Sequence, residues 1–136
     1  MPCGRSLGLD VGEKRIGVAL SDEEGWLAAP LEVILRREAA RDFARIAGLV
    51  QQHGAARVVV GLPRTLAGEI GPQAQRVQRW AARLEPHLPV PLVYWDERYS
   101  TAEAARLLAV TPARHRPGID AAAAAVILQD FLDAAR

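Results

Sequence analysis

Two short runs of alternating residues near the start of the chain constrain its fold more than any other feature. Residues 6–22 read SLGLDVGEKRIGVALSD, and in both halves every second residue is a larger apolar one. A period of two, over two runs joined by the three residues GEK, predicts a β-hairpin. The apolar residues of the first strand share one face, so Asp10 lies on the other face with only glycine and alanine around it. The hairpin therefore places a carboxylate inside a sheet and leaves open volume above it.

The rest of the chain alternates between strand and helix patterns. Segment 26–35 predicts a third strand, in which Pro30 indicates an edge or a bulge. After it we expect a helix, a strand, a helix, a strand and two helices, over 38–53, 56–63, 72–84, 90–100, 100–109 and 119–133. The order βββαβαβαα favours an α/β fold with a mixed five-stranded sheet flanked by helices. Its first three strands are antiparallel, and crossover helices lead to the later ones.

Composition limits the kinds of protein that this chain can be. With 136 residues, half of them hydrophobic, a single domain over 1–136 is expected. The formal net charge is only +1, so no global basic field indicates a nucleic-acid partner. Cys3 is the one cysteine, which excludes an internal disulfide. Since no segment has the pattern of a signal peptide or a membrane span, we expect a cytoplasmic protein without a membrane partner.

Acidic residues stand at the ends of two later elements. Asp96 and Glu97 end a predicted strand, at the kind of sheet edge where α/β folds place their chemistry, although pairing with Arg98 explains them equally well. Asp120 begins the last predicted helix and fits an N-cap. It also falls on the helical face that must pack against the sheet, which is unusual for a cap. Three separated carboxylates can therefore converge over the sheet.

Asp10 has ordinary explanations too, as a cap of the turn at Gly12 or as an ion-pair partner of Lys14 or Arg15. The open volume around it favours convergence with the other acids. Converging, partly buried carboxylates repel each other and need a cation. Oxygen ligands suit Mg²⁺ or Mn²⁺ rather than zinc, and two such ions activate water in phosphodiester cleavage. The acids therefore favour metal-assisted phosphoryl hydrolysis.

Four segments together resemble one known family, YqgF/RuvX. They read LGLDVGEKRIGVALSD, VVVGLPRTLAGEIGPQA, VPLVYWDERYSTAEA and GIDAAAAAVILQDFLD, and they cover almost the whole chain in order. Members are named as Holliday junction resolvases or pre-16S rRNA processing nucleases, and the family has a ribonuclease H-like fold. The resemblance implies that Asp10, Glu97 and Asp120 are the catalytic metal ligands, with Asp96 assisting. The chain departs from many relatives at Ala121, where they have lysine.

The resemblance also suggests why glycines surround Asp10: a metal ion and the scissile phosphate have to approach it closely. Polar and basic residues near the acids are candidate nucleic-acid contacts, with a plain turn or a solvated surface as the ordinary alternative. They are Lys14, Arg15, Arg64, Thr65, Arg98, Thr101, Arg114 and Arg116. The three tryptophans at 26, 80 and 95 are expected in the core rather than as base-stacking platforms.

We therefore expect a metal-dependent nuclease that acts on structured nucleic acid, either an rRNA precursor or branched DNA, with water as nucleophile. A homodimer is left open. One alternative is a non-catalytic nucleic-acid-binding domain of the same fold, although such a scaffold does not need the acids. A less favoured one is a fragment of an actin-like ATPase, since the strand pair is similar to the first phosphate motif of those proteins. Those ATPases need two lobes, and 136 residues supply one.

Overall fold

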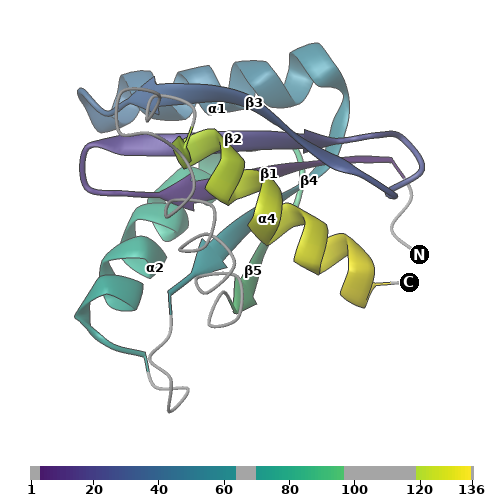
Figure 1. Ribbon diagram of the computed structural model, residues 1–136. Helices are drawn as coiled ribbons and strands as arrows, with labels where there is room; N and C mark the ends of the chain where they lie inside the picture. Colours follow the sequence, from purple (N-terminus) through teal and green to yellow (C-terminus); the bar gives the residue numbers. More distant parts are fainter. Residues whose placement is uncertain (1–3, 64–69, 97–118, 136) are drawn as a thin grey trace.

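A computed structural model describes residues 4–63, 70–96 and 119–135 (Figure 1). Nearly every element expected from the sequence is present. The predicted helix over 100–109 lies outside the described residues. The elements are β1 (Arg5–Val11), β2 (Arg15–Ser21), β3 (Ala28–Leu35), α1 (Ala39–His53), β4 (Ala55–Leu62), α2 (Pro72–Leu84), a 3₁₀ turn η1 (Glu85–His87), β5 (Leu92–Asp96) and α4 (Ile119–Ala134).

The five strands form one mixed sheet in the order β3-β2-β1-β4-β5. Strand β2 pairs antiparallel with both β1 and β3, whereas β4 pairs parallel with β1 and β5 pairs parallel with β4. This arrangement confirms the predicted mixed sheet and places β1 at its centre. Pro30 lies on the edge strand β3, beside a shift of register between β2 and β3. The edge position and the bulge that this proline indicated are both present.

Sequence signals at the helix ends are confirmed as well. Gly54 follows α1 in the left-handed conformation, with φ 63° and ψ 37°, which a residue with a side chain rarely adopts. Pro72 opens α2, where its missing N–H removes no helical hydrogen bond. In the described part of the chain, no helix is long and apolar enough to cross a membrane.

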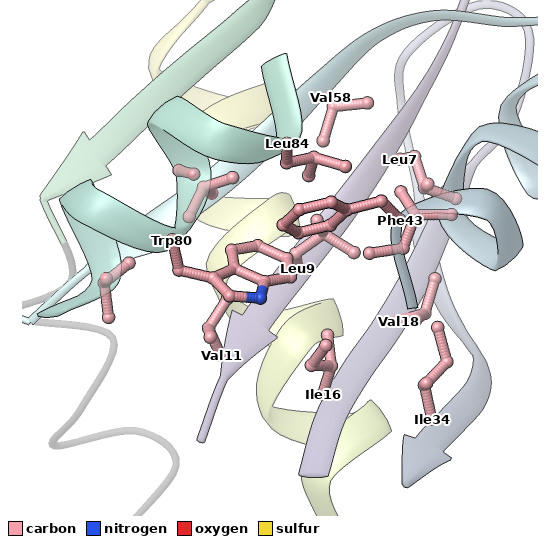
Figure 2. Packing of buried hydrophobic residues seen from close by; sticks show 14 of the residues in the cluster. Leu7, Leu9, Val11, Ile16, Val18, Ile34, Phe43, Val58, Trp80 and Leu84 are labelled. Atoms are coloured by element: carbon pink, nitrogen blue, oxygen red, sulfur yellow. The ribbon is translucent and has the colours of Figure 1, made fainter. Parts of the chain in front are cut away.

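Helices cover both faces of the sheet, and the two faces have different cores. On one face, α1 and α2 bury Phe43 and Trp80 against Leu9 and the other large apolar residues of β1, β2 and β4 (Figure 2). The rings of Phe43 and Trp80 meet edge to face at 5.6 Å between centroids. On the other face, α4 packs Leu128 and its neighbours onto small residues such as Ala19. Small residues on this face let α4 approach the sheet closely.

The tryptophans do not all lie in the core as predicted. Trp80 does, with 6% of its surface exposed. Trp95 is half-buried and contacts Phe131 of α4 edge to face. Trp26 was predicted wrongly, because 45% of its surface is exposed. It precedes β3 in the loop after β2, where its backbone carbonyl accepts a hydrogen bond from Gln129 of α4.

Candidate active site

Asp10 is the last residue but one of the central strand β1, and its side chain faces α4. Its register partner on β2 is Gly17. Partners in an antiparallel pair point to the same face of the sheet. On that face, the residue two positions before Asp10 is Gly8, whose added Cβ would lie 2.9 Å from the Cβ of Leu128. Asp10 is thus partly buried between the sheet and α4.

Gly17 lies directly beneath the first turn of α4. A Cβ built on Gly17 would overlap the backbone carbonyl oxygen of Asp120. The sequence suggested that the glycines beside Asp10 leave room for a metal ion and a phosphate. They do not. They admit the backbone of α4. This close approach brings Asp120 of α4 to Asp10 of β1, although the two residues stand near opposite ends of the chain.

The two carboxylates interact electrostatically. Burial, and then the negative charge of Asp120, raise the pKa of Asp10 from its ordinary value of 3.8 to about 6. Among the described residues, neither acid has an ion-pair partner. The turn is closed by the N–H of Gly12, which donates to the carbonyl of Arg15, and not by Asp10. Both ordinary explanations of Asp10, a turn cap and an ion pair, therefore lack support within those ranges.

A divalent cation fits these two acids. Two neighbouring carboxylates, partly buried and without a basic partner in the described part of the chain, supply oxygen ligands and negative charge to Mg²⁺ or Mn²⁺. No cluster of three histidines, cysteines or acids occurs within the described ranges. Glu97, the third ligand implied by the family resemblance, lies just beyond β5 and outside them.

Asp96 lies on the other face of the sheet from the acid pair. It is the register partner of Leu62, which lies in the core formed with α1 and α2. Parallel partners share a face of the sheet, so Asp96 lies on the face opposite Asp10. Trp95, one residue earlier, contacts Phe131 of α4 and confirms the alternation. This placement does not support the expectation that Asp96 assists at the metal.

Two of the predicted nucleic-acid contacts lie at the β1–β2 turn, which follows Asp10 and Val11. Lys14 is in the β1–β2 turn, and Arg15 opens β2 on the same face as Gly17; both are exposed. The other predicted site residues lie outside the described residues: Arg64, Thr65, Glu97, Arg98, Thr101, Arg114 and Arg116.

Arg36 supports the turn next to Asp10, a role that the sequence did not predict. Its guanidinium donates a hydrogen bond to the carbonyl of Gly12 at 2.7 Å, and its backbone N–H donates to the carbonyl of Lys14 at 2.9 Å. Both ends of the three-residue turn are thus fixed by one residue that follows β3. A single arginine after a strand carries no local signal for such a role.

Comparison with known proteins places the chain in a family. The family described as "RuvX: Holliday junction resolvase" matches residues 4–134. A protein of Symbiobacterium thermophilum, named "Putative pre-16S rRNA nuclease", is 51% identical over 130 residues, which cover 93% of this chain and 90% of the relative. A protein of the same name from Chloroflexus aggregans is 50% identical over 133 residues, covering 96% and 94%.

Solved structures show the same fold at low sequence identity. Thermus thermophilus RuvC in complex with a Holliday junction substrate superposes with a TM-score of 0.61 and 17% identity, over 97% of this chain and 95% of that one. A structure of RuvC alone from the same organism gives 0.58 and 16%, over 96% and 95%. The predicted ribonuclease H-like fold is thereby confirmed. Together with the match over residues 4–134, the identity to these relatives shows that the chain belongs to the RuvX family.

Proposed function

We propose that the chain is a nuclease that uses Mg²⁺ or Mn²⁺ to hydrolyse phosphodiester bonds in structured nucleic acid. The observation that carries the proposal is the pair of Asp10 and Asp120, which lie together at the end of the central strand with no basic partner among the described residues. Family membership and the nuclease names of the relatives support the reaction class. We further propose that one domain, 1–136, carries this activity in the cytoplasm.

Three residues would hold the cation: Asp10 on β1, Asp120 on α4 and Glu97 after β5. Glu97 is included because it matches the acid of the family's DER motif, and it directly follows β5 in the sequence. When bound there, the cation would activate water and stabilise the leaving oxygen. The protein's contribution is to hold two carboxylates together against their repulsion. The cation that they hold would then stabilise the negative charge that develops in the reaction.

Basic residues near the acid pair favour a substrate held by its backbone. Lys14 and Arg15 are exposed beside the acid pair and can meet the phosphates next to the cleaved bond. Relatives are named for pre-16S rRNA and the family for Holliday junctions, so both a precursor rRNA and a four-way DNA junction are candidate substrates. Both are folded nucleic acids with bends and branches.

A cleavage assay tests the proposal. End-labelled precursor rRNA, four-way DNA junctions and single strands are incubated with the purified protein and Mg²⁺, Mn²⁺ or EDTA. We expect cleavage of a structured substrate with metal, none with EDTA, and none by Asp120→Asn. The control Glu24→Gln neutralises an exposed carboxylate in the loop after β2 and should cleave normally. Binding of these substrates without cleavage under any of the metal conditions would instead support the non-catalytic alternative.

A further inference from the structure

A second, strongly basic site lies on the other face of the sheet. An open pocket of about 790 Å³ is bordered by the end of β1, by Arg36 and by α2. Four arginines line it, namely Arg36, Arg76, Arg79 and Arg83, and we call it the arginine pocket. Among the described residues that line it, one is acidic, namely Glu13. The arginines are four of the 17 lysine and arginine residues of a chain whose formal net charge is only +1.

The arginines of this pocket are not neutralised within the described ranges. None of the four forms an ion pair there, and α2 contains no acidic residue over Pro72–Leu84. Arg36 lies over the ring of Trp80 at 5.9 Å, and Arg83 lies over Phe43 at 5.8 Å. Aromatic rings thus hold two guanidinium groups in place, and each keeps its positive charge. Like charges gathered without partners are unfavourable, and an anion relieves that repulsion.

The spacing of the arginines suits an extended anion rather than a small one. Arg76, Arg79 and Arg83 stand three and four residues apart on one side of α2, so they span about 10 Å along the helix axis at 1.5 Å per residue. Each strand of a nucleic-acid duplex carries one phosphate per 3.4 Å of axis, so about three phosphates fit beside this row. Arginine also matches phosphate oxygens with its paired N–H donors.

The pocket adjoins the acid pair through the β1–β2 turn. Val11 and Gly12 line it, and they follow Asp10 directly. Two residues of extended chain span about 7 Å, although neighbouring side chains point to opposite faces. Figure 1 shows α2 and the start of α4 at the same end of the hairpin. A nucleic acid bound at Asp10 that bends around the turn, past Lys14, therefore reaches the arginines of α2.

We propose that the arginine pocket binds the phosphate backbone of the substrate beyond the cleaved bond, on the sheet face opposite the acids. The inference rests on the proposed nuclease function. It assigns the preference for structured substrates to this second contact, because a bent or branched nucleic acid can occupy both faces of the sheet at the turn. A short single strand reaches only the acid pair.

The test compares two variants that each remove two positive charges. Arg76→Gln with Arg79→Gln changes exposed pocket residues that have no described contact with the core. Arg37→Gln with Arg41→Gln changes exposed arginines outside the pocket and is the control. Binding of a labelled four-way junction and of precursor rRNA is measured at several salt concentrations, in an Asp10→Asn background that prevents cleavage.

The loss of two phosphate contacts should lower the slope of log affinity against log salt by about 1.4–1.8. Over the tenfold range from 1 M to 0.1 M salt, the affinity of the pocket variant then falls behind that of the wild type by roughly 25- to 60-fold. The control pair should lose much less. Thermal melting shows whether both double variants are folded. If both are folded and bind equally, the inference is overturned.

Cleavage separates this inference from the proposed function. With Asp10 restored, the pocket variant should cleave a short single strand as fast as the wild type does and a junction or precursor rRNA more slowly at limiting substrate. If the wild type cleaves nothing with metal, the nuclease proposal fails, while the binding comparison still decides the pocket. If the pocket variant loses the short strand and the structured substrate equally, the arginines act at the acid pair and the second contact is refuted.

Discussion

Asp10→Asn is expected to abolish cleavage and to make the metal-free protein more stable by about 3 kcal/mol at pH 7. Burial and the charge of Asp120 raise the pKa of Asp10 to about 6, and each tenfold change in proton affinity corresponds to about 1.4 kcal/mol. Ionised Asp10 therefore opposes folding when no cation is bound. Asparagine has a similar shape without the charge, so it removes this penalty together with a metal ligand.

The sign of the pH dependence follows from the direction in which the pKa moves. Because the pKa of Asp10 is raised in the folded state, the folded protein binds the proton more tightly than the unfolded chain does. This contribution is fully present below pH 3.8 and is lost as the pH rises through about 6. The stability difference between Asp10→Asn and the wild type should therefore be largest above pH 6 and disappear near pH 4. Urea unfolding at several pH values measures it.

The control for this experiment is Glu24→Gln, which neutralises an exposed carboxylate and should change stability by less than about 0.5 kcal/mol. Added Mg²⁺ should stabilise the wild type and leave Asp10→Asn unaffected, since a ligand stabilises only the state that binds it. A variant that is less stable than the wild type at pH 7, or that still cleaves, would remove Asp10 from the site.

Gly17→Ala is expected to lower the cleavage rate by roughly 100-fold and to lower the free energy of unfolding by about 1–3 kcal/mol. The added methyl group would overlap the carbonyl of Asp120, and backbone cannot rotate aside as a flexible side chain can. The first turn of α4 must move away from the sheet. A displacement of about 1 Å at a catalytic group is enough for a loss of this size. Steady-state cleavage and urea unfolding measure the two effects.

Gly48→Ala is the matched control, because Gly48 lies within α1 with no atom within 4 Å of an added Cβ. There the methyl group should stabilise the helix by about 0.5–1 kcal/mol and leave cleavage unchanged. If both alanine variants behaved alike, the close approach of α4 to β2 would not be what positions Asp120.

Local patterns in the sequence predicted most of the fold because local rules decide most of it. The hairpin follows from two alternating runs and a short turn, α1 ends where Gly54 takes up a left-handed conformation, and α2 begins at Pro72. These signals require only neighbouring residues. The mixture of parallel and antiparallel pairing followed from the same elements, since parallel neighbours need crossover helices and antiparallel ones need only turns.

Features that depend on packing between distant parts of the chain could not be predicted from the sequence. Alternation placed Asp10 and the glycines on one face, but it does not say what covers that face, so space for α4 was interpreted as space for a ligand. The same alternation, applied to β5, places Asp96 on the sheet face opposite Asp10. The arginine pocket joins the end of β1 to α2, and no local pattern connects them.

The most direct test of a metal site at Asp10 and Asp120 is a titration of the metal-free protein with Mn²⁺, followed by the electron paramagnetic resonance signal of the free ion. We expect Mn²⁺ to bind the wild type and Glu24→Gln at about pH 7.5, well above the pKa of Asp10. Binding should weaken below about pH 6, where Asp10 takes up a proton, and should be lost in Asp120→Asn. Equal Mn²⁺ affinity in Asp120→Asn and the wild type would contradict the assignment of these two acids as metal ligands.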